Sequence, residues 1–255
     1  MRPEIVYLSP SEAVSMGDAW FSIASIEHFW IRRRLAVLRC LTADFPWGSS
    51  KLAEIGCGSG LVQRQIEDAF GATVDGFDLN ETALKQSVCR SSPRFCYNIF
   101  ARSPSLESNY DGLILFDVLE HLDNDQEFLK AALFHLKPGG RVFINVPADP
   151  RLMSAYDRAA GHVRRYSEDV LLALANACGL NVESWSYWGW PLRPLLHARK
   201  WRLRNVEDAG TILRAGFAPP GRIANALLLF LSQFERIPQH FSGSSLMLVA
   251  QRPLE

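Results

Sequence analysis

The chain lacks both an excess of charge of either sign and any long apolar run. Its 27 Lys and Arg residues balance 27 Asp and Glu residues, so the formal net charge is zero. Proteins that bind nucleic acid neutralise phosphates with a basic surface, and the overall charge gives no case for such a partner. No run of about 18 uncharged apolar residues occurs, so the sequence predicts no membrane-spanning helix.

Cysteine is scarce and unpatterned. The five cysteines form no C-x-x-C pair and have no histidine at the spacing of a metal site, so we expect no metal ion. Their odd number, in a sequence without a recognisable signal peptide, favours reduced thiols and a cytoplasmic location. The composition is otherwise ordinary, and 255 residues are enough for one globular core with an elaboration.

A glycine-rich stretch is the most informative part of the sequence. Residues 51–55 are predicted to form a buried strand and residues 61–70 a helix. Between them Gly56, Gly58 and Gly60 alternate with other residues. Because glycine has no Cβ, this backbone can turn sharply and approach a ligand closely. The helix start adds unpaired N–H groups and a partial positive charge, so we predict a site for a small polar ligand.

The spacing of these glycines differs from the dinucleotide fingerprint G-x-G-x-x-G. With Glu54 they form E-x-G-x-G-x-G, which is similar to the first motif of class I S-adenosylmethionine (SAM)-dependent methyltransferases. The resemblance implies that the loop wraps the amino-acid end of SAM, and that Glu54 holds the ammonium group indirectly or through water. Cys57 lies in this cofactor loop and is counted with its cofactor-binding residues, although a role as a small apolar filler is favoured. A plain structural turn is the alternative interpretation.

An acid ends the next predicted strand, residues 72–78. Asp78 lies about 20 residues beyond the loop, the distance at which a βαβ unit presents a carboxylate to a ribose. Such a carboxylate can accept hydrogen bonds from both ribose hydroxyls. A helix cap is the alternative role, but Asn80 is the better cap candidate for a helix over 81–90. We therefore expect Asp78 and its neighbour Leu79 to contact the cofactor.

Strands and helices alternate from residue 51 to residue 147, which predicts an α/β fold with a doubly wound, mostly parallel sheet. The resemblance implies the Rossmann-like methyltransferase fold with seven strands, the last of them antiparallel. Lys137–Gly140 carries the proline and glycines that end a helix. The remaining predicted elements are strands over 94–100, 111–116, 141–146, 180–190 and 244–251, and helices over 125–136 and 168–178.

Two more strand ends carry polar side chains. Methyltransferases often place an acid after the third strand, against the adenine amine; that acid is missing here, and Asn98 is the candidate for the contact. The fourth strand is followed by D-V-L-E-H-L, residues 117–122, which is similar to a motif of the family. The resemblance implies that Asp117 and Val118 line the methionine end of SAM. His121 either faces the substrate as a base or packs under the cofactor.

Residues 153–167 resemble a bacterial type 11/type 23-like subgroup of these methyltransferases. That subgroup carries S-x-H-D…G-H-x-R-R-Y, and Tyr156 stands where it usually has histidine. Its early H-W-W-F…R-R and late G-x-S-L elements are matched by residues 28–34 and 243–246. Residues 153–167 show no strong hydrophobic period, so we predict a loop at the rim of the site.

The side chains of this loop are candidates for acting on a methyl acceptor. His162 could take a proton from a hydroxyl or an amine, with Tyr156 as a further catalytic candidate. Arg164 or Arg165 could clamp a carboxylate or phosphate, and Tyr166 could orient the acceptor. Alternatively, His162 and Tyr166 are hydrogen-bonded struts and the arginines are solvated.

Helical segments flank the predicted core. A helix over 19–42 forms either a lid or a sheet-edge helix with a solvated face at Arg32–Arg34. As a lid it would contact substrate through Trp20, His28, Phe29 and Trp30. Residues 190–204 are basic and interleaved with Trp and Leu, so they either touch anionic lipid at a membrane surface or cover the acceptor pocket. A further helix is predicted over 222–236.

These predictions divide the chain into a helical lid (1–48), a SAM-binding core (49–190 and 244–255) and a helical substrate cap (191–243). We expect a cytoplasmic methyltransferase, monomeric or homodimeric, that uses SAM to methylate oxygen or nitrogen of a small-molecule acceptor such as a natural-product or sugar intermediate. Two alternatives stay open: a lipid-linked acceptor at the membrane surface, and a non-catalytic SAM-binding protein with a regulatory or assembly role.

Overall fold

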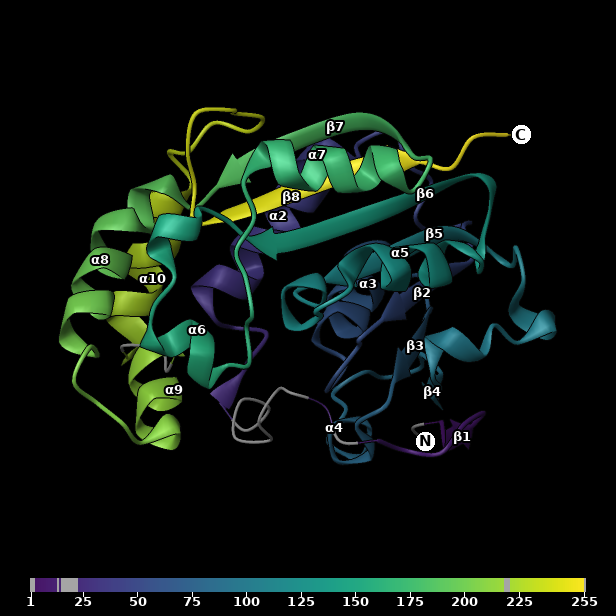
Figure 1. The fold of residues 1–255 in the computed structure, drawn as a ribbon, viewed down its shortest axis with the longest axis horizontal. Helices are drawn as coiled ribbons and strands as arrows, with labels where there is room; N and C mark the ends of the chain where they lie inside the picture. Colours follow the sequence, from purple (N-terminus) through teal and green to yellow (C-terminus); the bar gives the residue numbers. More distant parts are fainter. Residues whose placement is uncertain (1–2, 13, 15–22, 218–220, 255) are drawn as a thin grey trace.

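The computed structural model describes residues 3–12, 14, 23–217 and 221–254. Its core is one sheet with the strand order β1-β4-β3-β2-β5-β6-β8-β7 (Figure 1). Every neighbouring pair from β1 to β6 in this order is parallel, and β8 runs antiparallel to both β6 and β7. The strands are β1 (Ile5–Tyr7), β2 (Leu52–Ile55), β3 (Val74–Asp78), β4 (Arg94–Cys96), β5 (Tyr110–Phe116), β6 (Leu136–Pro147), β7 (Asn181–Trp188) and β8 (Ser245–Gln251).

The sheet has eight strands, so the prediction of seven is wrong. The additional strand β1 lies in the segment that was expected to form only a helical lid. It pairs with β4, with Ile5 opposite Arg94, and forms one edge of the sheet. A strand of three residues is too short to show an alternating pattern, which is why the sequence does not reveal it.

Helices cover both faces of the sheet, which confirms the doubly wound arrangement. α2 (Phe29–Leu41) and α3 (Leu61–Phe70) pack on one face, and α5 (Asp125–Leu133) and α7 (Glu168–Ala177) pack on the other. Leu113 and Leu115 of β5 face α5 and α7, whereas Ile114 and Phe116 face α2 and α3. Successive side chains of a strand point to opposite faces, so a strand covered on both sides is apolar throughout.

Two predicted element boundaries move. The helix α4 (Glu81–Lys85) is shorter than the predicted helix over 81–90. The proline and glycines of Lys137–Gly140 do not separate a helix from a strand; they lie within β6, which already starts at Leu136. There the register between β5 and β6 shifts, and Gly139 has a φ of 76° that favours glycine.

The cap lies beyond the carboxyl end of β6, on the left of Figure 1. It contains α8 (Arg193–Arg202), α9 (Ala209–Phe217) and α10 (Gly221–Ser232), next to the short helix α6 (Ala155–Ala159). The expectation of a plain loop over 153–167 is therefore wrong at α6. Tyr156 and Ala160 pack against Leu203, Ile212 and Leu213, so α6 joins the cap to the core. Among the residues that the structure describes, no helix has the length and hydropathy needed to cross a membrane.

Candidate active site

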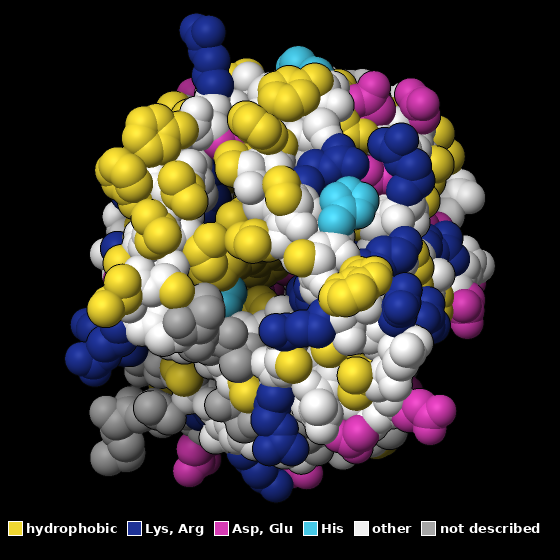
Figure 2. Space-filling model, turned by 90° about the vertical axis from the view of Figure 1, so that its left-hand side faces the viewer, with side chains coloured by type: hydrophobic (Ala, Val, Ile, Leu, Met, Phe, Trp, Pro, Cys, Tyr) yellow, Lys and Arg dark blue, Asp and Glu magenta, His cyan; other side chains and the backbone are white. Residues whose placement is uncertain are grey.

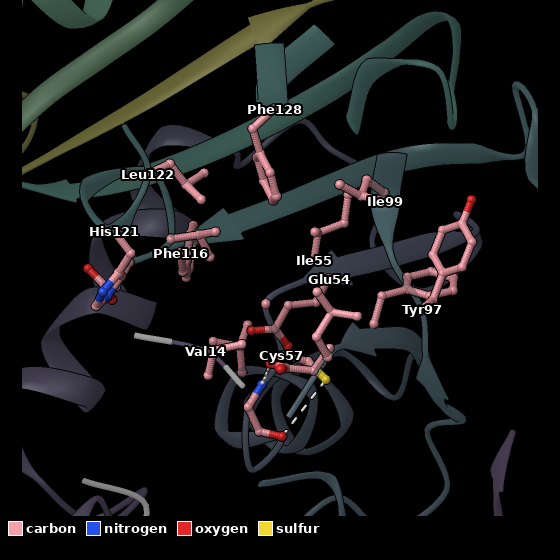
Figure 3. A pocket seen from close by; sticks show the side chains of 18 of the residues that line it. Val14, Glu54, Ile55, Cys57, Tyr97, Ile99, Phe116, His121, Leu122 and Phe128 are labelled. Atoms are coloured by element: carbon pink, nitrogen blue, oxygen red, sulfur yellow. Dashed lines mark hydrogen bonds between the residues drawn. The ribbon is translucent and has the colours of Figure 1, made fainter. Parts of the chain in front are cut away.

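A cavity of about 450 Å³ lies at the carboxyl ends of β2, β3, β4 and β5. Figure 3 shows Glu54 and Cys57 on one side of it, Leu122 and Phe128 on the other, and His121 and Tyr97 toward its two ends. The predicted cofactor residues in its wall are Glu54, Gly56, Cys57, Gly58, Asp78, Leu79, Asn98, Asp117 and Val118. We call this the first cavity.

The glycine-rich loop needs its glycines for two reasons. Gly56 and Gly60 have φ values of 76° and 71°, a left-handed conformation that glycine adopts without strain. A Cβ at Gly56 would lie 2.5 Å from Cγ2 of Val118, and one at Gly60 would lie 2.5 Å from Oγ of Ser87. Gly60 is not in the cavity wall, so it acts by shaping the turn into α3 and not by direct contact.

Asp78 ties the loop to the end of β3. Its Oδ2 accepts a hydrogen bond from the Gly58 N–H at 2.7 Å, and its Oδ1 accepts one from the Asn80 N–H at 2.8 Å. Burial raises the pKa of Asp78, while these N–H groups favour the ionised form. Each carboxylate oxygen can accept more than one hydrogen bond, so Asp78 can still bind ligand hydroxyls from the cavity wall.

Glu54 is an unsatisfied carboxyl in the floor of the first cavity. It is only 2% exposed, and its Oε2 has no hydrogen-bond partner among the described residues. Burial raises the pKa of Glu54 to about 8, although Arg34 nearby partly opposes the rise. A cationic ligand would stabilise the ionised form of such a buried carboxyl, because the cation replaces the hydration that burial removes.

Asn98 reaches the first cavity with its side-chain amide already engaged. Its Nδ2 donates to Oε1 of Glu12 at 3.0 Å, and its Oδ1 accepts from the Phe100 N–H at 3.0 Å. Glu12 also lines the cavity, although sequence reasoning missed it. An isolated acid in an irregular segment carries no pattern that could have marked it. The end of the cavity near Asn98 therefore carries a carboxylate, supplied by the N-terminal segment.

Asp117 follows β5 in the left-handed region, with a φ of 57°. Its Oδ1 accepts a hydrogen bond from Nδ2 of Asn145 at 2.8 Å, and its Oδ2 pairs with Arg34. Arg34 lies 5.0 Å from the ring centres of both Trp30 and Phe116, a cation–π geometry. The interpretation of Arg32–Arg34 as a solvated face is thus wrong for Arg34, which α2 directs into the site, and for Arg33, which is buried and pairs with Glu235.

A second cavity of about 290 Å³ lies between the core and the cap. Asp117 lines both cavities, so the two meet at the end of β5. Predicted acceptor and catalytic residues in the second wall are His28, Phe29, Trp30, Tyr156, His162 and Arg165. The cap contributes mostly apolar side chains from α8, α9 and α10, among them Leu195, Phe217 and Leu228.

A buried charge network holds His162 in the second cavity. Asp157 accepts hydrogen bonds from Nδ1 of His162 at 3.3 Å, from Nε of Arg165 at 2.8 Å and from Oγ of Ser154 at 2.6 Å. Burial would raise the pKa of Asp157, but these partners hold it well below the usual range. Asp157 therefore stays ionised and fixes the ring of His162, leaving Nε2 to face the cavity.

Glu120 and His121 complete the junction between the two cavities. Neither carboxyl oxygen of Glu120 has a hydrogen-bond partner among the described residues, and burial raises its pKa well above normal. Nε2 of His162 lies 3.9 Å from Oε1 of Glu120. Burial and the nearby His162 lower the pKa of His121 to about 4, so His121 is neutral near pH 7.

Glu120, His121 and His162 could also hold a metal ion. Their possible ligand atoms all lie within 4.8 Å of one another. Carboxylate and imidazole ligands of this kind suit several divalent metals. The prediction of no metal site rested on spacing along the sequence, which cannot show that the fold brings His162 next to Glu120 and His121.

Comparison with known proteins identifies the family. A family model described as a methyltransferase domain matches residues 27–184. The chain belongs to the methyltransferase-domain family. It is 30% identical to a ubiquinone biosynthesis O-methyltransferase of Idiomarina loihiensis over 37% of this chain and 41% of that protein. It is 26% identical to a "probable S-adenosylmethionine-dependent methyltransferase" of Mycolicibacterium smegmatis over 68% of each chain.

Solved structures agree on the fold. A magnesium protoporphyrin IX methyltransferase of Synechocystis, crystallised with S-adenosylhomocysteine, aligns with a TM-score of 0.55 and 14% identity over 92% of this chain and 93% of that one. At this identity the likeness shows the Rossmann-like methyltransferase fold alone. The chain spans less than half the length of the ubiquinone relatives that it matches.

The residues of the first cavity fit the family's cofactor, SAM. The unsatisfied carboxyl of Glu54 suits an ammonium group, and Asp78 suits a ribose. Gly56 and Gly58 lie in the wall of this cavity, and Val118 leaves no room for a Cβ at Gly56. Cys57 is buried against Leu84 and Cys96, as an apolar filler would be.

Some of the predicted site residues lie elsewhere. Arg164 bonds to Asp125 at 3.1 Å and to the Asp123 carbonyl at 2.8 Å, outside both cavities. Tyr166 is fully buried and donates to the same Asp125 at 2.7 Å, so both are struts and not acceptor ligands. Trp20 lies outside the described residues.

His28 lines the second cavity but is committed to the protein. Its Nδ1 accepts the Trp30 N–H at 3.2 Å, which caps α2, and its Nε2 donates to the Phe217 carbonyl at 3.1 Å. Burial lowers the pKa of His28 to about 4. His28 is therefore a neutral link between α2 and α9 that closes one side of the cavity.

Proposed function

We propose that this chain transfers a methyl group from SAM to a hydroxyl oxygen of a small, largely apolar acceptor held in the second cavity. The observation that carries the proposal is the position of Asp117 in the wall of both cavities. A donor in the first cavity and an acceptor in the second would then meet at one point. SAM supplies a methyl group on a sulfonium, a strong electrophile, so the protein's part is mainly to position the acceptor.

His162 is the proposed proton acceptor. Its Nδ1 is hydrogen-bonded to the ionised Asp157, which keeps the proton on Nδ1 and leaves Nε2 free to take one from the acceptor hydroxyl. This arrangement of a base and an orienting carboxylate recurs in enzymes that activate a hydroxyl. Glu120, with its raised pKa, is a neutral carboxyl beside the same point and can hydrogen-bond the hydroxyl oxygen.

The charges of the second cavity favour a hydroxyl over an amine. Arg199 lines it and is in no ion pair among the described residues, whereas Arg165 is paired with Asp157 and Arg34 with Asp117. A protonated amine would be repelled by Arg199, whereas a neutral hydroxyl or a phenolate would not. The O-methyltransferase relative supports the same choice of atom.

The apolar cap sets the rest of the acceptor. Phe29, Leu195, Leu196, Phe217 and Leu228 line the part of the cavity contributed by α2 and the cap. An apolar body in this part would place its hydroxyl toward Glu120 and His162. The cysteines are free thiols, which supports the cytoplasmic location proposed with this function.

The test is transfer of labelled methyl from SAM to a panel of apolar phenols, alcohols and matched amines. We expect product from hydroxyl compounds, and a drop of roughly 10²–10⁴-fold in turnover for His162→Gln with SAM binding retained. Arg164→Gln, outside both cavities, is the matched control and should keep turnover. Transfer only to amines, or full activity in His162→Gln, would contradict the proposal; parallel runs with EDTA and with added Mn²⁺ show whether Glu120 and its neighbours need a metal.

A further inference from the structure

The helix α10 turns an apolar stripe away from the protein. Ile223, Leu227, Phe230 and Phe234, at its end, recur at helical spacing and so share one face. Ile223 is 88% exposed and Phe234 is 73% exposed, with the other two more than half exposed. Along α10 itself only Ser232 is buried among the described residues. A surface helix normally buries its apolar stripe, so this face is open to a partner.

Aromatic side chains of neighbouring segments extend the stripe. Trp190 and Phe241 are both exposed, and their ring centres lie 6.0 Å apart. On α8, Leu195 and Trp201 are more than half exposed. Figure 2 views the molecule from the cap side and shows hydrophobic side chains gathered there around a hollow, with Lys and Arg nearby. We call these apolar side chains, together with the stripe, the docking face.

The charge around the docking face is one-sided. Between residues 190 and 236 the exposed cations are Lys200, Arg202, Arg204, Arg214, Arg222 and Arg236. The acids of this span are Glu207, Asp208 and Glu235. Glu235 is buried, where it pairs with Arg33 and accepts the N–H groups of Gly189 and Trp190. In a chain of zero net charge, this span therefore carries an excess of exposed cations together with its exposed apolar side chains.

We propose that the docking face binds the surface of an anionic phospholipid bilayer. Such a surface supplies both an apolar layer for the stripe and negative headgroups for the surrounding cations. A second copy of the chain would supply only an apolar surface. In a two-fold dimer the same surface of both copies is in contact, so the cations of one copy would face the cations of the other. Aromatic side chains at the rim also suit the boundary between headgroups and acyl chains.

The docking face adjoins the second cavity. Leu195 belongs to the docking face and lines the second cavity, and Leu228 of α10 lines it too. Resting on the proposed function, this places the cavity mouth against the bilayer. The acceptor would then be an amphiphile whose hydroxyl end enters the cavity first and whose apolar end stays toward the bilayer.

Vesicle sedimentation of the full chain tests the docking face without any need for turnover. We expect binding to vesicles of phosphatidylcholine mixed with phosphatidylglycerol, little binding to phosphatidylcholine alone, and release by salt. The variant Leu227→Ser/Phe230→Ser/Phe234→Ser should lower partitioning more than about tenfold. Val170→Ser, an equally exposed apolar position on α7, should bind like the wild type.

SAM titration of each variant separates a docking failure from a folding failure or from failure of the proposed function. The triple variant should bind SAM as the wild type does, since none of its positions lines the first or second cavity. Equal vesicle binding by the triple variant and the wild type would overturn the docking face. The docking face would also be overturned if the wild type did not bind anionic vesicles. The same holds if light scattering showed a wild-type dimer that the triple variant does not form.

Discussion

The two cavities of this chain are built in different ways. The first is assembled mainly from one strand–turn–helix unit and from residues that end the next strands in order, Glu54 to Ser59, Asp78, Asn98 and Asp117. The second takes its wall from α2, the segment after β5, α6 and the cap helices, which are far apart in sequence. The proposed cofactor site is thus a local property of the α/β unit, whereas the proposed acceptor site depends on how distant segments meet.

The two cavities also treat buried charge differently. In the first, Glu54 keeps an unsatisfied carboxyl oxygen, so a cationic ligand completes the site. In the second, the carboxylate of Asp157 accepts hydrogen bonds from His162, Arg165 and Ser154 and needs no ligand, whereas the neighbouring carboxyl of Glu120 has no hydrogen-bond partner among the described residues. The first cavity is therefore expected to respond to substitutions through ligand affinity, and the second through stability and turnover.

Removing the charge of Asp157 should have the largest effect. Asp157→Ala leaves Arg165 buried without its carboxylate and frees the ring of His162, at a cost of about 3–5 kcal/mol in the free energy of unfolding. Ser154→Ala removes only one hydrogen bond to the same carboxylate and should cost about 1 kcal/mol. Urea denaturation measures both. A loss below 1 kcal/mol for Asp157→Ala would show that the network does not support the second cavity.

Gly56 should matter for ligand affinity more than for stability. Gly56→Ala brings a Cβ against Val118 and strains a positive φ, at a cost of about 1–3 kcal/mol that moves the loop, so SAM affinity should fall roughly tenfold or more. Gly71→Ala is the matched control: its φ is also positive, but no atom lies within 4 Å of the added Cβ. It should cost stability and leave calorimetric SAM affinity unchanged; equal affinity losses would contradict the local role of the loop.

Glu54 should make SAM binding depend on pH. The unfolded carboxyl ionises near its ordinary pKa of 4.5, whereas the folded one holds its proton up to about 8. The folded chain therefore binds more protons in this window, and Glu54 lowers stability as pH rises from 4.5 to 8. Binding of a cation favours the ionised form, so SAM affinity should rise over the same window.

Glu54→Gln removes this titration and should bind SAM about tenfold more weakly at pH 8, with a flatter pH dependence. Calorimetry in buffers of different ionisation enthalpy detects the proton released on binding to the wild type near pH 7. Identical pH profiles for the wild type and Glu54→Gln would contradict the proposal that this carboxyl binds the ammonium group of SAM.

Asn98 should show the smallest effect, because its amide serves the protein. Asn98→Ala loses the hydrogen bonds to Glu12 and to the Phe100 N–H, so SAM affinity should fall only a few-fold, about 1 kcal/mol. Glu12→Gln should give a similar loss. A hundredfold loss for Asn98→Ala would instead mean that its side chain turns away from Glu12 and contacts the cofactor directly.

The sequence predicts those parts of the molecule that short stretches of chain determine by themselves. The alternating glycines, the acid after β3 and the apolar run of β5 identify the α/β core and the first cavity, because each pattern fits within one strand–helix unit. The burial of Arg34 was not predictable, since three adjacent arginines on a helix indicate a solvated face unless Asp117 is known to lie beside them. The sharing of Asp125 by Arg164 and Tyr166 depends on the same kind of long-range contact.

The cap shows the same limit. The apolar period of residues 222–236 predicts the helix α10 but not the direction in which its apolar stripe points. Periodicity shows that a helix has an apolar face, and it does not show what that face contacts. The strand β1 and the helix α6 were missed because three and five residues are too few to establish a period.

The most direct test of the account compares Asp78→Ala with His162→Gln in paired assays of SAM binding and methyl transfer. If the cavities have separate roles, the wild type binds SAM and S-adenosylhomocysteine at micromolar concentration, Asp78→Ala loses this binding, and His162→Gln keeps it while losing transfer. No binding of SAM by the wild type, or loss of binding in His162→Gln equal to that in Asp78→Ala, would contradict a cofactor cavity and an acceptor cavity that meet at Asp117.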